Sequence, residues 1–152
     1  MEQTEKKSSP NRVGKEYNDF CIISGNPEIG EGTWIGYHTV IDGTGGLKIG
    51  KNCSIASGVH IYTHDSTRRA VLGLKRDYEG YSHIDRAPVE IGDNCFIGAN
   101  SVILKGVKIG NRVVIGALSL VNKDLPDDCI AAGNPVRIIK MKSQLDSSRS
   151  NP

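Results

Sequence analysis

The feature that most constrains the fold of this chain is an aliphatic residue that recurs at every sixth position, with two interruptions. The aliphatic residues in phase are Ile29, Ile35, Ile41, Ile49, Ile55, Ile61, Ile91, Ile97, Ile103, Ile109, Ile115 and Val121. Gly or Ala usually comes next, and a small or β-branched residue usually stands four positions after the aliphatic one. A period of six matches neither the 3.6-residue turn of a helix nor the two-residue alternation of a single strand. The repeat therefore predicts short strands joined by tight corners.

The same repeat predicts an all-β solenoid. Three hexads form a triangular coil of about 18 residues, and neighbouring coils are expected to stack as parallel strands about 4.8 Å apart. The aliphatic side chains then point inward and lie on one another, and we expect the following glycine to ease the corner backbone. Cys53 and Cys95 occupy the small inward position, so packing explains them better than reactivity does. Together with Cys21 and Cys129, they show no CxxC or zinc-binding spacing.

Both interruptions of the repeat predict irregular structure. The segment DGTGGL adds two residues between Ile41 and Ile49, which predicts a bulge. The second interruption covers about residues 62–88 and predicts a loop extruded from the corner of a coil. Loops of that length in a compact domain are usually functional or disordered. The stretch HIYTHD places His64 just beyond the point where the repeat breaks off, near the start of this interruption.

Length and charge bound the class of protein. The 152 residues carry a net charge of +2 without a dense basic cluster, so we expect no nucleic-acid partner. No apolar run reaches the ~20 residues of a membrane span and no signal peptide precedes the repeat, so we expect a cytoplasmic protein with reduced thiols. The predicted organisation is a flexible N-terminal arm over residues 1–20, a β-helix domain over 21–135, and a short C-terminal helix with a tail over 136–152.

The sequence from about residue 21 to 142 resembles the hexapeptide-repeat acyltransferases, which are left-handed parallel β-helix enzymes. The stretches with the sharpest resemblance are HIYTHD, IGDNCFIGANSVI and NKDLPDDCIAAGNPVRIIK. They are similar to stretches of the maltose and galactoside acetyltransferases and of sugar O-acetyltransferases of polysaccharide biosynthesis. The left hand of the helix is implied by the family, because the spacing leaves it undecided and parallel crossovers are normally right-handed.

The resemblance implies a homotrimer whose active sites lie in clefts between subunits, with acetyl-CoA bound along the groove. It implies acetyl transfer to a hydroxyl group of a saccharide or sugar-linked precursor, with His64 as the general base. A neutral imidazole near pH 7 suits removal of the acceptor's proton, a step that typically contributes about 10²–10⁴-fold. Neither a metal nor a covalent enzyme intermediate is expected.

Several residues are candidates for the acceptor side of the site. His38 matches a position where the galactoside enzymes have an asparagine that contacts the acceptor, and it is either an acceptor ligand or an exposed corner residue. Asp42 either binds sugar hydroxyl groups or forms a turn before glycine. His83, in the loop, is a third candidate. Asp65 either orients the imidazole of the general base or caps a turn.

The resemblance also implies which residues lie along acetyl-CoA. These residues are Phe96, Ala99, Ala117, Asn122, Lys123, Arg137 and Lys140. Ala99 and Ala117 are expected beside the pantetheine arm, and Arg137 and Lys140 beside the CoA phosphates, where positive charge is favourable. Leu118 stands where the family usually has glycine, and its larger side chain is expected to narrow the path of the pantetheine arm. The basic residues of the loop can meet CoA phosphates or an anionic sugar nucleotide, or simply keep the loop solvated.

Other functions fit parts of the pattern. N-acetylation of an amino sugar nucleotide is the nearest alternative, and a xenobiotic acetyltransferase fits less well because such enzymes have a different loop around their histidine. A non-catalytic β-helix scaffold and a γ-type zinc carbonic anhydrase belong to other classes. The carbonic anhydrases bind zinc through three histidines, whereas His60 and His64 have no third histidine in a matching context. Titration with CoA tests the scaffold hypothesis, and metal analysis tests the zinc hypothesis.

Overall fold

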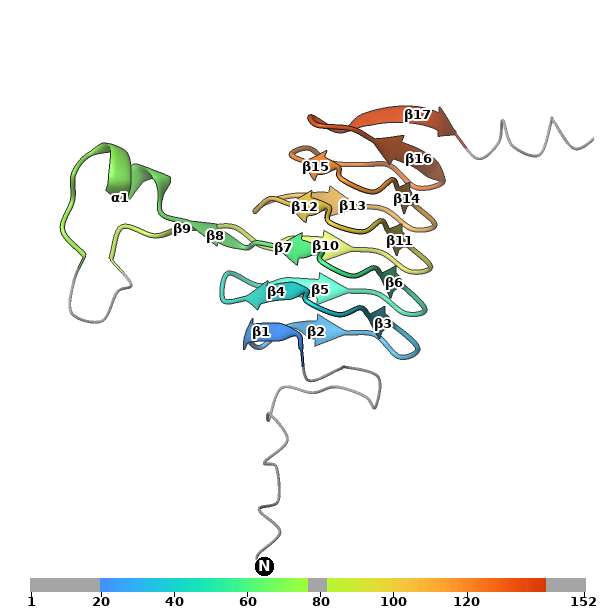
Figure 1. The fold of residues 1–152 in the computed structure, drawn as a ribbon, viewed down its shortest axis with the longest axis horizontal. Helices are drawn as coiled ribbons and strands as arrows, with labels where there is room; N and C mark the ends of the chain where they lie inside the picture. The colour runs from blue at the N-terminus through green and yellow to red at the C-terminus, as the bar shows by residue number, and fades with distance from the viewer. Residues whose placement is uncertain (1–19, 77–81, 142–152) are drawn as a thin grey trace, which may run out of the picture.

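A computed structural model describes residues 20–76 and 82–141, which form a solenoid of stacked triangular coils (Figure 1). Each coil passes through three sheets in turn, and the strands of successive coils pair in parallel. This is the left-handed parallel β-helix that the repeat and the family resemblance predict. The predicted N-terminal arm lies outside the described residues, apart from Phe20.

Three sheets, called sheets 1, 2 and 3 in the order in which the chain enters them, form the faces of the solenoid. Sheet 1 contains β1 (Ile22–Gly25), β4 (Val40–Gly43), β7 (His60–Ile61), β12 (Val102–Ile103) and β15 (Leu120–Val121). Sheet 2 contains β2 (Glu28–Ile29), β5 (Leu47–Ile49), β10 (Val89–Ile91) and β13 (Lys108–Ile109). Sheet 3 contains β3 (Trp34–Ile35), β6 (Ser54–Ile55), β11 (Phe96–Ile97), β14 (Val114–Ile115), β16 (Cys129–Ala132) and β17 (Arg137–Met141).

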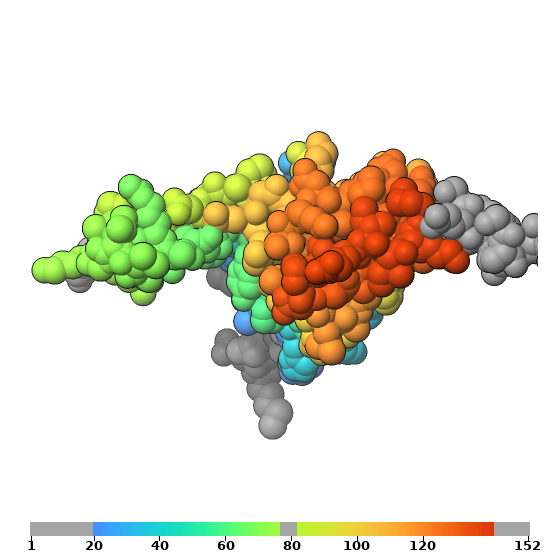
Figure 2. Space-filling view, turned by 90° about the horizontal axis from the view of Figure 1, so that it is seen from above, coloured from blue at the N-terminus to red at the C-terminus, as the bar shows by residue number. Residues whose placement is uncertain are grey.

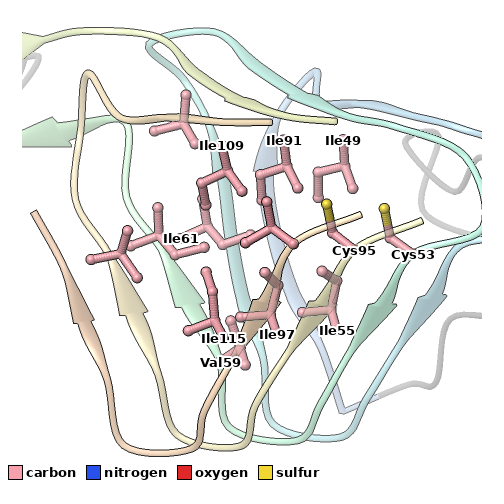
Figure 3. Packing of buried hydrophobic residues seen from close by; sticks show 14 of the residues in the cluster. Ile49, Cys53, Ile55, Val59, Ile61, Ile91, Cys95, Ile97, Ile109 and Ile115 are labelled. Atoms are coloured by element: carbon pink, nitrogen blue, oxygen red, sulfur yellow. The ribbon is translucent and has the colours of Figure 1, made fainter. Parts of the chain in front are cut away.

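The aliphatic residues of the repeat form the core as three rows in register, one on each sheet. The row on sheet 1 is Ile23, Ile41, Ile61, Ile103 and Val121. The row on sheet 2 is Ile29, Ile49, Ile91 and Ile109. The row on sheet 3 is Ile35, Ile55, Ile97 and Ile115. Figure 3 shows members of these rows pointing into the interior beside Cys53 and Cys95, which are each 2% exposed, as their small inward position predicts.

The corners correct one expectation about glycine. A positive φ occurs at the third position after the inward aliphatic residue in the regular corners, not at the first. The residues with this conformation are Gly32, His38, Asn52, Gly58, Asn94, Asn100, Gly106, Arg112, Leu118 and Asp128. The glycine at the first position is needed for another reason, because a Cβ on Gly36 would lie 2.6 Å from the backbone nitrogen of Ser57 in the next coil. Close approach of stacked backbones therefore explains that glycine.

The outer faces of the three sheets differ in polarity. Sheet 2 presents a ladder of alternating charges, Glu28, Lys48, Glu90 and Lys108. Sheet 1 presents Ile22, Val40, His60, Val102 and Leu120. Sheet 3 presents Trp34, Ser54, Phe96, Val114 and Ile130. Two faces of the solenoid are therefore largely apolar and the third is charged.

The loop between β7 and β10 leaves the solenoid, as the second interruption of the repeat predicts. It contains β8 (His64–Asp65), α1 (Thr67–Val71) and β9 (Asp85–Arg86). β8 and β9 pair as an antiparallel ribbon that projects from the body of the solenoid (Figure 1). Seen from above, the green loop stands well clear of the coils (Figure 2).

The end of the described chain corrects a second expectation. A short helix was predicted over residues 136–152, but residues 137–141 form the strand β17, which pairs antiparallel with β16. Residues 142–152 lie outside the described part of the chain. α1 has five residues, and no helix within residues 20–76 and 82–141 has the length and hydropathy needed to cross a bilayer.

Candidate active site

The first interruption of the repeat buries a carboxylate. β4 continues past Ile41 to include Asp42, which is only 2% exposed. A buried carboxylate requires hydrogen-bond donors to offset the loss of hydration. Its donors are Ser24 Oγ at 3.3 Å, Thr44 N at 3.0 Å, Thr44 Oγ1 at 2.6 Å, Thr63 N at 2.8 Å and Thr63 Oγ1 at 2.9 Å.

These donors hold Asp42 in its ionised form. Burial by itself raises the pKa of the carboxyl group, because it removes the charge from water. The hydrogen bonds from Thr44 and Thr63 outweigh burial, so the pKa of Asp42 lies far below its ordinary value. Asp42 is therefore a negatively charged hydrogen-bond acceptor throughout the neutral range.

The second interruption brings His64 into contact with this carboxylate. The Nδ1 atom of His64 lies 2.6 Å from Oδ2 of Asp42 and 3.2 Å from Oγ1 of Thr44. An ionised carboxylate can accept a hydrogen bond but cannot donate one, so Nδ1 has the proton in this contact. The side chain of His64 is 38% exposed, whereas that of Asp42 is buried. Asp42 thus fixes the orientation of an imidazole that remains accessible.

Sequence reasoning missed the two threonines that hold this pair together. Thr63 is fully buried, and its hydroxyl accepts a hydrogen bond from the backbone N–H of Gly45 at 2.8 Å while donating to Asp42. Thr63 therefore joins the bulge after β4 to the start of the loop. The available signal was position, because Thr44 and Thr63 each stand at an interruption of the repeat, within two residues of a predicted site residue.

Asp65 caps a turn rather than orienting the imidazole. Its Oδ1 accepts a hydrogen bond from the backbone N–H of Thr67 at 2.9 Å, and its Oδ2 lies 3.1 Å from Nζ of Lys105. The hydrogen bond from Thr67 and the contact with Lys105 lower the pKa of Asp65. Of the two roles expected for this residue, the structure supports the turn, and Asp42 occupies the position next to the imidazole.

A cleft of about 1010 Å³ lies where the loop leaves the solenoid, and His64 is part of its lining. The corner between sheets 1 and 2 forms one wall, with Thr44, Tyr62, Leu104, Lys105 and Asn122. The loop forms the other wall, including residues of α1 and β9. Arg69, Arg76 and Arg86 come from the loop, so the cleft has a cationic lining.

The predicted acceptor residues do not gather in this cleft. Asp42 is buried against His64 and is not among the residues that line the cleft. His38 is exposed at the corner between sheets 3 and 1, where its ring lies 5.8 Å from that of Phe20. His83 is exposed in the loop and has a positive φ, but only its neighbour Ile84 lines the cleft.

The predicted coenzyme residues fall into two groups. Asn122 lines the cleft with His64, and Lys123 follows it in the chain, exposed. The others lie on sheet 3 or at its corner with sheet 1: Phe96 on β11, Ala99 and Ala117 at the corner, Arg137 and Lys140 on β17. Leu118, beside Ala117, is 71% exposed. Sheet 1 therefore separates Ala99 and Ala117 from His64 within one chain.

The histidines offer no metal site in the described part of the chain. The Nδ1 atom of His60 lies 3.1 Å from the hydroxyl of Tyr62, and His64 contacts Asp42. Within residues 20–76 and 82–141, no group of three or more His, Cys, Asp or Glu side chains is arranged to hold a metal ion. The zinc hypothesis therefore has no support from these residues.

Two family descriptions match the repeat. "Bacterial transferase hexapeptide (six repeats)" matches residues 88–123, and "Hexapeptide repeat of succinyl-transferase" matches residues 28–63. The two matches lie on either side of the loop. They correspond to the regular coils before and after the second interruption.

Individual proteins are similar over most of the chain. A provisionally named acetyltransferase of Bacillus subtilis, YvoF, is 53% identical over 88% of this chain and 80% of its own length. Galactoside O-acetyltransferase of Escherichia coli is 36% identical over 80% of this chain and 57% of its own length. The chain spans 57–64% of the length of two of the curated relatives that it matches.

A solved structure extends the likeness to three dimensions. It is the D94N mutant of AntD, an N-acyltransferase from Bacillus cereus, in complex with dTDP and coenzyme A. The match has a TM-score of 0.72 and 30% sequence identity, and covers 86% of this chain and 74% of AntD.

Proposed function

The chain belongs to the hexapeptide-repeat acyltransferase family, and on this premise we propose that it transfers an acetyl group from acetyl-CoA to a hydroxyl group of a saccharide or sugar-linked precursor. The observation that supports this most directly is the contact between His64 and the buried, ionised Asp42 at a cleft. A general base needs an accessible nitrogen, a fixed orientation and a partner for its positive charge. The pair meets these three needs.

The proposed reaction is a direct transfer. Nδ1–H of His64 donates to Asp42, which leaves Nε2 with a lone pair for the proton of the acceptor hydroxyl. The acceptor oxygen attacks the thioester carbonyl, and the tetrahedral intermediate collapses with loss of the CoA thiolate. His64 then returns the proton to that thiolate, so no group remains on the enzyme. Asp42 stabilises the imidazolium while it holds the proton.

We propose that the coenzyme binds between two subunits of a homotrimer. Ala99 and Ala117 lie at the corner where the chain enters sheet 1, and His64 lies beyond the corner where the chain leaves it. A thioester bound beside the two alanines is therefore not presented to His64 of the same chain. A second copy with its corner against the cleft would supply it. The apolar outer faces of sheets 1 and 3 support such packing, because the buried cores of subunit interfaces are depleted in charge. A contact between different surfaces closes into a ring when a rotation repeats it.

N-acylation of an amino sugar nucleotide is a second candidate, favoured by the likeness to AntD. The same base serves an amine, because the proton of the attacking nitrogen must also leave. The two products differ in stability, since an ester is hydrolysed by mild alkali and an amide is not. Product stability in alkali therefore separates O-transfer from N-transfer.

The first test is calorimetric titration of the purified protein with acetyl-CoA and with CoA, combined with measurement of its mass in solution. We expect micromolar binding, a stoichiometry near one per chain, and the mass of a trimer. A screen of saccharides and amino sugars as acceptors of the acetyl group follows. A folded trimer without affinity for CoA would overturn the proposal in favour of a non-catalytic scaffold.

A further inference from the structure

We propose that the acceptor has an anionic group, a carboxylate or a phosphate, near the hydroxyl or amine that receives the acetyl group, and that Arg86 binds this anion. The inference rests on the acetyl transfer proposed above and names the chemical class of its acceptor. It comes from the pairing of β8 with β9 and from the charges that line the cleft.

Strand pairing sets Arg86 beside the proposed base. In the ribbon formed by β8 and β9, His64 is the register partner of Arg86. Residues directly opposite each other in an antiparallel pair project from the same face, with Cβ atoms about 4.5–5.5 Å apart. Both residues line the cleft. Because backbone pairing holds the ribbon, the side chain of Arg86 leaves the chain directly beside that of His64, and its guanidinium is within reach of the same part of the cleft.

The remaining charges of the cleft point to the same class of ligand. Arg69, Arg76 and Lys105 also line it, whereas Asp65 is the one acidic residue among the described lining residues. The carboxylate of Asp65 already contacts Lys105 and the backbone of Thr67. A concave surface with an excess of cations attracts anions. Guanidinium groups in particular match carboxylates and phosphates through paired hydrogen bonds.

The phosphates of the coenzyme do not explain Arg86. In the proposed reaction His64 takes the proton of the acceptor hydroxyl as that oxygen attacks the thioester carbon, and the whole pantetheine arm separates this carbon from the CoA phosphates. A side chain that begins beside His64 therefore reaches the acceptor and the acetyl group more readily than those phosphates. Neutral sugar hydroxyls have no need of several cations, so an anionic acceptor accounts for the arrangement.

The test compares acceptors that differ only in charge. Glucose is compared with glucuronate, glucose 6-phosphate and UDP-glucose, and glucosamine with glucosamine 6-phosphate. For each, kcat/KM is measured by release of the CoA thiol, and affinity by calorimetric titration of the CoA-loaded protein. A charge-assisted contact predicts a preference of about 10–100-fold for at least one anionic member over its neutral partner. The uronate and phosphate arms identify which anion is bound.

Variants connect the preference to Arg86. We expect Arg86→Gln to abolish the preference, mainly through KM, and Arg86→Lys to keep part of it, because lysine retains the charge without the paired geometry. Arg68→Gln is the matched control, because Arg68 lies on α1 but is not among the residues that line the cleft. This control should keep the wild-type preference. A shift in the melting temperature would identify a variant that had lost its fold.

The outcomes separate this inference from the proposed function. Equal or weaker turnover and binding of every anionic member would overturn the inference, even if CoA binds and neutral sugars are acetylated. An anion preference that survives Arg86→Gln would also overturn it. Loss of CoA binding in the wild type would instead refute the proposed acetyl transfer, whatever the sugars do.

Discussion

The regular coils and the two interruptions of the repeat differ in what they bury. In the coils, inward residues are mostly aliphatic, and the buried hydroxyl groups bond to backbone carbonyls, as Ser101 Oγ donates to the carbonyl of Gly116 at 3.0 Å. At the interruptions, the buried residue is the carboxylate of Asp42, and its partner His64 is partly exposed. The coils bury apolar surface, whereas the interruptions connect a buried charge to a cleft.

This difference indicates where a solenoid can hold a reactive group. The stacked coils repeat one geometry, and the neighbouring coil limits the volume that is available to each side chain. The extra residues after Ile41 and after Ile61 release the chain from that register, so Asp42 and His64 can meet across 22 positions of sequence. We therefore expect substitutions in the coils to change stability and substitutions at the interruptions to change catalysis.

The largest expected effect is the loss of activity in His64→Ala. Without its general base, the enzyme should lose about 10²–10⁴-fold in kcat, while CoA binding and the denaturation midpoint stay close to wild type. Steady-state kinetics measure kcat, a titration with CoA measures binding, and denaturant unfolding measures the midpoint. Retained kcat would remove His64 from the mechanism, and a large fall in stability would contradict the division between coils and interruptions.

Ile97→Ala should show the opposite behaviour. Ile97 is fully buried between Ile55 and Ile115 in the row on sheet 3, and the backbone ladder prevents the coils from collapsing into the space. We expect a loss of about 2–5 kcal/mol in the free energy of unfolding, with kcat per folded molecule unchanged. Denaturant unfolding is compared at one protein concentration, because association adds to apparent stability. Ile139→Ala, at a residue 66% exposed, is the control.

The coils and the interruptions also differ in how far the sequence predicts their structure. The period of six predicts the strands and the inward rows, because stacking repeats the same contacts in each coil. It also locates His64 at a break. The period does not predict which carboxylate contacts His64. A bulge releases Asp42 from the regular alternation of side chains, and Asp65, although it is next to His64 in the sequence, caps a turn instead. A short apolar run such as Ile138–Ile139 fits a helix or a strand equally well, and only the open edge of β16 decides for the strand β17.

Asp42→Asn tests the connection between the two kinds of region, because it changes a buried residue at an interruption. Asparagine places an NH₂ group among donors that need an acceptor, so we expect a loss of about 1–3 kcal/mol in stability together with a lower kcat. A loss of activity without any loss of stability would mean that the threonine donors do not depend on the charge. Denaturant unfolding and kinetics on the same samples decide this.

The stability difference between wild type and Asp42→Asn should also depend on pH. The pKa of Asp42 in the folded protein lies below its unfolded value of about 3.9. The contribution of the carboxylate to stability is therefore fully present above that value and is lost as the pH falls toward the folded-state pKa. We expect this difference to shrink below about pH 4. A difference that grows as the pH falls below about 4 would contradict the lowered pKa of Asp42.

Two glycines compare a coil with the loop directly. A Cβ on Gly36 would lie 2.6 Å from the backbone nitrogen of Ser57, whereas a Cβ on Gly73 would meet no atom within 4 Å. Gly36→Ala should cost about 1–3 kcal/mol, since the coils must separate to admit the methyl group. Gly73→Ala should cost about 1 kcal/mol, because its φ of +62° is strained for alanine. A loss in Gly36→Ala that is no larger than the strain cost in Gly73→Ala would mean that the coils admit the methyl group without separating.

The smallest expected effect belongs to the charged face. Lys108 and Glu90 on sheet 2 form an ion pair at 3.0 Å, with side chains 69% and 51% exposed. Lys108→Ala should change the free energy of unfolding by less than about 1 kcal/mol, and added salt should remove the difference. The result also bears on assembly, because the proposed trimer leaves sheet 2 in water and packs through sheets 1 and 3. A larger loss, or a change in the mass of the assembly, would mean that the subunits meet through the charged face instead.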